Sequence, residues 1–256
     1  MNAIHGTMRS LILAIQFLTR LPTPQVEDYS KQELSSTSPW FPVVGIIVGL
    51  FVTTWITIST FIDPWLGALF GLIAWTWVTG ALHLDGLADL TDALGAAHRD
   101  PQRFLQVMRD PHIGTFGVVA LTITPISKLV LLYVLIAHHQ LNWFVLPLVC
   151  AWSRLGAVTW SAWLPSLHQG SGESFAWKTN NTLIIISALI LLAVCALMAP
   201  SLCVAPLVLA LWWAFLRYRV GGMTGDCLGA GIEVSEIGLL LITVSAPVII
   251  RAWTSM

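Results

Sequence analysis

Seven apolar stretches constrain the fold of this chain more than any other feature of its sequence. Each is close to the roughly 20 residues that a helix needs to cross a membrane. The second, fifth and sixth are near the lower limit of that length, so the sequence predicts six to eight spans, with seven as the central number. The stretches are Trp40–Ile62, Pro64–Leu82, Thr115–Ala137, Asn142–Leu164, Thr182–Ala199, Ser201–Leu216 and Ile237–Trp253.

The composition also indicates a membrane protein. Hydrophobic residues make up 56% of the chain and charged residues 10%, whereas about a quarter of a soluble domain is charged. A chain with so few charges cannot cover itself with polar surface. We therefore expect an all-α, polytopic transmembrane helical bundle that forms a single domain over residues 1–256. The net charge of −1 provides no basic field that would attract nucleic acid.

The polar segments between the stretches fall on one side of the membrane when seven spans are threaded from a cytoplasmic N-terminus. Most of the 12 Lys and Arg residues then lie on the cytoplasmic side, as the positive-inside rule expects. The segment Met8–Leu21 is apolar but holds Arg9 and Arg20, and we interpret it as an interfacial helix or a partial span. The polar segments are Arg20–Pro39, His83–Gly114, Pro165–Asn181 and Arg217–Glu236.

Three aspartates follow the second stretch, at Asp85, Asp89 and Asp92. On a helix this spacing places all three carboxylates on one face. Like charges stacked in this way repel, and the repulsion grows at a membrane boundary, where the dielectric constant is lower. The pattern therefore predicts a bound cation. Carboxylate oxygens favour Mg²⁺, which also bridges phosphate oxygens. The alternative is a solvated acidic helix end.

A second motif, Gly221–Glu236, combines five glycines with three acidic residues. Glycine permits a sharp backbone path or a close approach between helices. We predict that Asp226 and Glu233 complete the metal site from this motif, and that Thr224 contacts substrate. The alternative is a glycine-rich segment that serves only helix packing.

Between these motifs lies Met108–Gly117, in which Arg109 and His112 are candidate phosphate contacts. The same segment also has the pattern of a helix start, with Asp110 as the N-cap and Pro111 in the first turn. The two interpretations are compatible.

Two basic residues, Lys128 and Arg154, lie inside predicted spans. A charge in the middle of a membrane costs several kcal/mol unless it is paired or lines a polar cavity. We predict that both contact substrate phosphates, or, for Arg154, the aspartates. The alternative is snorkelling to the membrane surface or a structural ion pair.

Several of these segments, in order along most of the chain, resemble the cobalamin synthase family. The family is a group of membrane enzymes that attach the lower-ligand nucleotide of vitamin B12. After the third aspartate the family often has glycine, and here Ala93 stands instead. The resemblance runs through Phe17–Pro22, Phe41–Gly45, Gly80–Asp89, Asp92, Ile113–Val118 and Gly221–Ala230.

The resemblance implies a Mg²⁺-dependent enzyme of the bacterial inner membrane. The family joins adenosylcobinamide-GDP to α-ribazole, or to its 5′-phosphate, and releases GMP. A ribose hydroxyl attacks the phosphorus attached to cobinamide and splits the pyrophosphate. In this chain, Asp85, Asp89, Asp92 and Asp226 would hold metal, and His83 or an acid such as Asp89 would act as the general base.

Other classes remain alternatives. CDP-alcohol phosphotransferases and aspartate-rich prenyltransferases share metal-assisted pyrophosphate chemistry. A transporter would also contain intramembrane charges and glycine-interrupted helices, but the sequence shows no inverted repeat. A purely structural membrane subunit would not depend on Mg²⁺ or on the motif acids. A homo-oligomer and an association with other cobalamin-assembly enzymes are further partners to test.

Overall fold

The computed structural model describes residues 2–97, 100–167 and 180–254. In these residues all regular elements are helices, and the single isolated β-bridge joins Ser166 to Met223. The elements are α1 (Asn2–Leu18), α2 (Lys31–Ser35), η1 (Ser38–Trp40), α3 (Phe41–Thr60), α4 (Pro64–Thr79), α5 (Leu82–Ala97), α6 (Pro101–Val107), α7 (Thr115–Ala137), α8 (Val145–Trp163), α10 (Asn181–Met198), η2 (Pro200–Val204), α11 (Ala205–Phe215), η3 (Leu216–Val220) and α12 (Gly225–Thr254).

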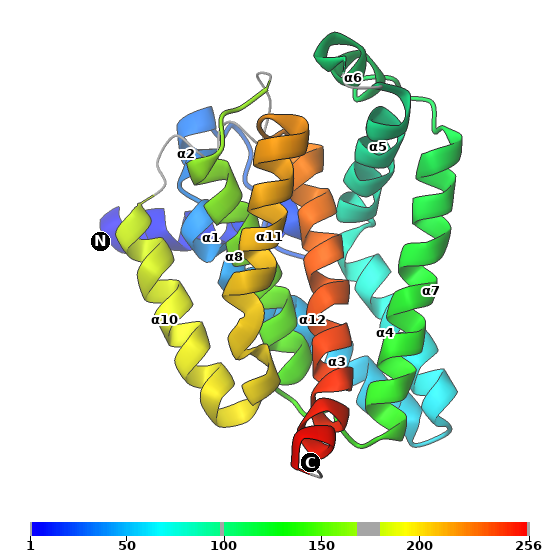
Figure 1. The fold of residues 1–256 in the computed structure, drawn as a ribbon. Coiled ribbons are helices and arrows are strands. Elements are labelled where there is room, and N and C mark those ends of the chain that lie inside the picture. Colours follow the sequence, from blue (N-terminus) through cyan, green and yellow to red (C-terminus); the bar gives the residue numbers. More distant parts are fainter. Residues whose placement is uncertain (1, 98–99, 168–179, 255–256) are drawn as a thin grey trace.

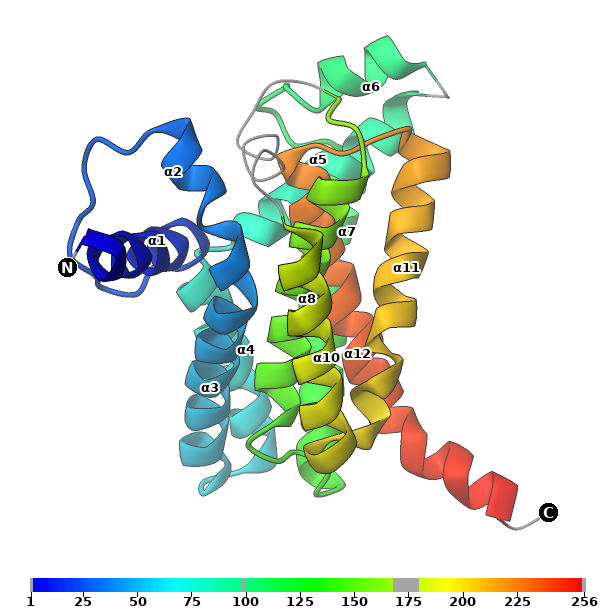
Figure 2. The same cartoon turned by 90° about the vertical axis from the view of Figure 1, so that its left-hand side faces the viewer.

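The long helices run side by side and form a bundle (Figures 1 and 2). Helices α2, α5 and α6 and the start of α12 lie at one end of it, which we call the motif end. The turns that connect α3 to α4 and α7 to α8 lie at the opposite end. Helix α1 crosses the bundle axis, which agrees with an interfacial helix rather than a span. The described part of the predicted polar segments is therefore gathered at one end.

Each of the seven predicted stretches contains a helix, but fewer helices are long and apolar enough to cross a membrane alone. Five meet that condition among the described residues, and a sixth span results if α4 and α5 count as one bent pair. Helix α4 has 16 residues, or about 24 Å, and is too short without α5. Helix α8 carries Arg154 and is almost entirely buried, so it has little need of a lipid-compatible surface.

Close backbone contact between α3 and α8 explains why α8 occupies the centre. A Cβ atom on Gly45 would lie 2.4 Å from the carbonyl oxygen of Cys150, and one on Gly49 would lie 2.4 Å from the Cα atom of Pro147. Only glycine at these two positions lets the helices come so close, and small residues serve membrane helix packing generally in this way.

The predicted span Pro64–Leu82 ends earlier than expected. Helix α4 begins at Pro64 with Asp63 as its N-cap and ends at Thr79, where Gly80 adopts a left-handed conformation with φ 60°. Ala81 also has a positive φ, and α5 then departs at 85° to α4. After this bend, the aspartate-bearing segment continues as helix α5 at the motif end.

Candidate active site

Helix α5 carries the three spaced aspartates, as the sequence predicts. Asp85 is exposed, Asp89 is partly buried and Asp92 is buried. Although they share one side of the helix, their surroundings therefore differ. The charges of Asp85 and Asp92 both act on Asp89, and so does that of Asp226 on α12.

The first turns of α12 pack directly against α5. A Cβ atom on Gly86 would lie 2.8 Å from the Cα atom of Asp226, and one on Gly229 would lie 3.4 Å from the Cα atom of His83. Gly86 therefore allows the two helices to approach closely, whereas the contact at Gly229 is an ordinary one, and Asp226 comes next to the Asp85–Gly86 segment. The structure thus brings together two motifs that are more than a hundred residues apart in the sequence.

A cavity of about 200 Å³ lies at this contact and is lined by His83, Asp85 and Asp226. His83 is 2% exposed, and neither of its ring nitrogens has a hydrogen-bond partner in the structure. Buried polar atoms are rarely left unpaired, because each unmade hydrogen bond costs about 1–3 kcal/mol. His83 is therefore the side chain in this cavity that most clearly lacks a ligand.

Thr224 has a structural role at the start of α12. Its hydroxyl accepts a hydrogen bond from the backbone N–H of Cys227 at 3.2 Å and lies 3.5 Å from a carboxylate oxygen of Asp226. Thr224 is 2% exposed. It therefore caps α12 and helps to orient Asp226, and the predicted contact with substrate has no support from its position.

The carboxylate of Asp92 binds the start of α7. Its two carboxylate oxygens accept hydrogen bonds from the backbone N–H groups of Gly114 at 2.7 Å and Gly117 at 2.9 Å. A Cβ atom at Gly114 or Gly117 would lie within 2.5 Å of this carboxylate. Asp92 thus supplies from α5 the cap that α7 lacks locally, since its N-cap residue is a glycine. This engagement distinguishes Asp92 from the predicted metal ligands Asp85 and Asp89.

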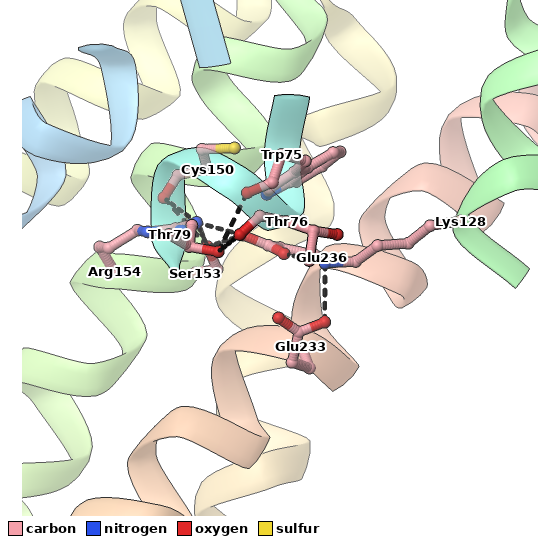
Figure 3. A network of polar contacts seen from close by, with 9 residues as sticks. All are labelled: Trp75, Thr76, Thr79, Lys128, Cys150, Ser153, Arg154, Glu233 and Glu236. Atoms are coloured by element: carbon pink, nitrogen blue, oxygen red, sulfur yellow. Dashed lines mark hydrogen bonds and ion pairs between the residues drawn. The ribbon is translucent and has the colours of Figure 1, made fainter. Parts of the chain in front are cut away.

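Lys128 and Arg154 belong to a separate buried cluster (Figure 3). The ammonium group of Lys128 lies 2.7 Å from Glu233 and 2.5 Å from Glu236, and Arg154 forms an ion pair with Glu236. Lys128 also lies over the ring of Trp75, 4.4 Å from its centroid. All four charged side chains are at least 95% buried and their formal charges cancel.

This charged cluster corrects two expectations. Glu233 lies two helical turns beyond Asp226, about 10 Å deeper along α12, and pairs with Lys128 rather than joining the aspartates. Lys128 and Arg154 find their partners in glutamates, which corresponds to the alternative of a structural ion pair. The sequence held a signal for this arrangement, because Glu233 and Glu236 are three residues apart and share a helix face.

Arg109 and His112 are exposed on the connection between α6 and α7. The sequence suggested Asp110 as the N-cap of the following helix. This prediction is wrong, because α7 starts at Thr115 and its N-cap is Gly114. Its carboxylate instead accepts the backbone N–H of His112 at 3.0 Å and contacts the imidazole at 2.7 Å. These hydrogen bonds hold the pKa of Asp110 below its usual value.

The described residues contain no group of three or more His, Cys, Asp or Glu side chains close enough to hold a metal ion by themselves. Mg²⁺ seldom uses such a cage, since it is usually bound by one or two carboxylates, water and substrate phosphates. The carboxylates of Asp85, Asp89 and Asp226 are hard oxygen donors of this kind. Asp226 lies beside the Asp85–Gly86 segment, and the charges of Asp85 and Asp226 both act on Asp89. The residues present therefore fit Mg²⁺ that binds together with a phosphate substrate.

Comparisons with known proteins agree with these motifs. The family model described as cobalamin-5-phosphate synthase matches residues 10–244. An adenosylcobinamide-GDP ribazoletransferase of Laribacter hongkongensis is 51% identical, over 93% of this chain and 98% of its own length. That of Thiobacillus denitrificans is 49% identical, over 92% and 94%, and that of Klebsiella pneumoniae is 32% identical, over 91% and 98%. No solved structure matches the chain. The chain therefore belongs to the cobalamin-5-phosphate synthase family.

Proposed function

We propose that this protein is an adenosylcobinamide-GDP ribazoletransferase whose active site is the cavity between α5 and α12. The observation that carries the proposal is the meeting of His83, Asp85 and Asp226 around one cavity, with the charge of Asp89 close by. The reactants follow from the names of the relatives. A ribose hydroxyl of α-ribazole, or of its 5′-phosphate, attacks the cobinamide-linked phosphorus, the pyrophosphate bond breaks, and GMP leaves.

The aspartates supply charge and position in this reaction. Asp85, Asp89 and Asp226 would hold Mg²⁺ against the pyrophosphate, and when bound the ion would neutralise negative charge on the phosphates. Displacement at phosphorus depends mostly on such neutralisation and on alignment of the reacting groups. In this proposal the aspartates supply the carboxylate ligands of Mg²⁺, and the substrate supplies the phosphate ligands.

His83 is suited to accept the proton of the attacking hydroxyl. His83 lines the cavity together with Asp85 and Asp226, and neither of its ring nitrogens has a hydrogen-bond partner in the structure. A neutral imidazole can receive a proton at one of them. Asp89 is the second candidate for this role. Arg109 and His112, which are exposed on the connection between α6 and α7, would bind phosphates of the substrate.

The proposal is tested with detergent-purified protein, adenosylcobinamide-GDP, α-ribazole and Mg²⁺. We expect GMP and a cobalamin product in equal amounts, and no reaction after removal of Mg²⁺ with a chelator. Asp89→Asn should lose nearly all GMP release while it remains folded. Release of GMP at the parental rate by this variant would contradict the role of the carboxylates, and product formation in micelles would exclude transport as the sole activity.

We also place the protein in the bacterial inner membrane with the motif end in the cytoplasm. Arg103, Arg109 and Arg219 lie on α6, the following connection and η3, which are all at this end. Positive residues remain on the cytoplasmic side during membrane insertion. The nucleotide substrate would then reach the site from the cytoplasm.

A further inference from the structure

A second and larger cavity, of about 470 Å³, opens at the same motif end. Its walls come from the last turns of α5, from α6 and from η3, and it shares no lining residue with the cavity that holds His83. Pockets of a few hundred cubic ångströms that combine apolar walls with few polar groups are typical of small-molecule sites. Three polar or charged side chains line this one, Asp100, Tyr218 and Arg219.

Asp100 presents a carboxylate of fixed orientation to this second cavity. Its Oδ1 atom accepts hydrogen bonds from the backbone N–H groups of Gln102 at 2.8 Å and Arg103 at 3.3 Å, at the start of α6. The cap uses Oδ1, so Oδ2 remains able to accept hydrogen bonds from a ligand. Phe104, which is 6% exposed, provides an aromatic wall beside it.

These features match guanine more closely than other parts of a corrinoid nucleotide. Guanine carries two neighbouring donors, N1–H and the 2-amino group, and one carboxylate oxygen has two lone pairs with which to accept both. Its planar ring suits a site with aromatic and aliphatic walls, and stacking of a base on an aromatic side chain contributes about 1–3 kcal/mol. Arg219 adds a cation that can bind ribose or phosphate oxygens.

The second cavity also lies within reach of the proposed reaction centre. Ala97 follows Asp89 by eight residues on α5, which corresponds to about 12 Å along the helix. On the other wall, η3 leads into α12, and the connection is held by hydrogen bonds from Met223 N to Pro165 O at 2.9 Å and from Leu167 N to Met223 O at 3.0 Å. An extended nucleoside diphosphate can bridge such a separation.

We propose that this second cavity binds the guanine nucleoside of the substrate and that Asp100 determines the preference for guanine. The inference rests on the proposed transferase function and adds a specificity site to it. Oδ2 of Asp100, the oxygen that the cap leaves open, would accept both N1–H and the 2-amino group, while the pyrophosphate extends toward Asp89 and Asp226.

The test is the variant Asp100→Asn, assayed with corrinoid substrates that carry GDP, IDP or XDP. Asn is as good an N-cap as Asp, so α6 should stay intact. The amide N–H₂ group of the new side chain would be a donor opposite the donors of guanine, which is unfavourable. The same group could donate a hydrogen bond to the 2-oxo group of xanthine. We expect kcat/KM for the GDP substrate to fall roughly ten- to hundredfold, mainly through KM. The preference should shift toward XDP.

The matched control is Asp63→Asn, because Asp63 is also an N-cap aspartate, which caps α4 at the opposite end of the bundle by accepting Trp65 N at 2.7 Å. This variant should keep the parental base preference. A parental GDP-to-XDP ratio in Asp100→Asn would overturn the inference. If that variant does not fold, Asp100→Ser keeps a capping residue and must then lose the discrimination between GDP and IDP. Absence of transfer in the parent protein would instead refute the proposed function.

Discussion

At the scale of single residues, identical side chains on one helix face have different partners. Asp85 lines the cavity between α5 and α12, Asp89 is close to the charges of other carboxylates, and Asp92 accepts two backbone N–H groups from α7. The difference depends on Gly114 and Gly117, since any side chain there would collide with the Asp92 carboxylate. A carboxylate that lies close to other carboxylates can bind a cation. A carboxylate at a helix N-terminus, such as Asp92, stabilises the fold.

The first prediction concerns Asp92. Asp92→Asn keeps one acceptor oxygen but removes the charge at the start of α7, so we expect a loss of about 1–2 kcal/mol in stability. Thermal unfolding in detergent measures it. Asp85→Asn is the control, because it relieves repulsion and should not lower the unfolding temperature. Equal destabilisation by both variants would contradict the distinction between the two aspartates.

The second prediction concerns His83. His83→Phe keeps an aromatic ring of similar size in the buried position but removes both nitrogens, so the protein should fold. We expect GMP release to fall by roughly 10²- to 10⁴-fold, the usual contribution of general base catalysis. Single-turnover rates over a range of pH measure it. A variant that retained the parental rate would exclude His83 from proton transfer.

At the scale of elements, α12 links the two centres of charge. Its first turn places Asp226 against α5, and two turns later Glu233 and Glu236 pair with α7 and α8. Trp75, near the end of α4, packs on Lys128 just before the bend that starts α5. The charged cluster therefore joins four helices, α4, α7, α8 and α12.

The third prediction tests the contact between α5 and α12. Gly86→Ala places a methyl group 2.8 Å from the Asp226 backbone, which cannot rotate away. We expect the helices to separate, with a cost of about 1–3 kcal/mol and a large loss of transfer activity. Gly229→Ala makes only an ordinary contact at 3.4 Å in the same interface, and it should retain activity. Full activity in Gly86→Ala would show that this close approach is not required.

The fourth prediction tests the charged cluster. Glu236→Gln leaves Lys128 with one acidic partner and Arg154 with none, and removing one member of a buried pair costs about 3–5 kcal/mol. Glu33→Gln removes the partner of Arg9 in an exposed pair, which should cost less than about 1 kcal/mol. Denaturant or thermal unfolding in micelles compares them. Similar stabilities of the two variants would mean that the buried charges are not paired as described.

At the scale of the whole molecule, the bundle has two unlike ends. The motif end holds α5, α6 and both cavities, and the opposite end consists of short turns in the described residues. A large soluble substrate requires an open polar end of the bundle. The short turns at the opposite end only connect consecutive helices. This asymmetry predicts that one side of the membrane performs all the chemistry.

The fifth prediction concerns orientation. Gln102 on α6 and His138 after α7 are both exposed, at opposite ends of the bundle. We expect a membrane-impermeant maleimide to label His138→Cys in intact spheroplasts, whose inner membrane is closed. It should label Gln102→Cys only after the spheroplasts are lysed. The parent protein is the control, since three of its four cysteines are buried. The reverse labelling pattern would place the motif end outside the cytoplasm.

Properties that depend on local sequence were predictable from the sequence alone. The apolar stretches indicate a helical membrane protein because lipid leaves the backbone no other partner. The spacing of Asp85, Asp89 and Asp92 indicates a shared helix face because helical periodicity is local. The family was also recognisable, since its motifs are short, contiguous and in order.

Properties that depend on contacts between distant residues were decided only by the tertiary structure. The sequence did not show that Asp92 caps α7 or that α4 bends into α5 at Gly80 and Ala81. It left open whether Lys128 and Arg154 pair with acidic residues or contact substrate, and the structure pairs both with glutamates. The partner of a charge depends on which helices meet and at what depth. Both the helix contacts and their depth are determined by the packing of the whole bundle. The same packing places similar carboxylates in a helix cap, in the charged cluster or at the cavity.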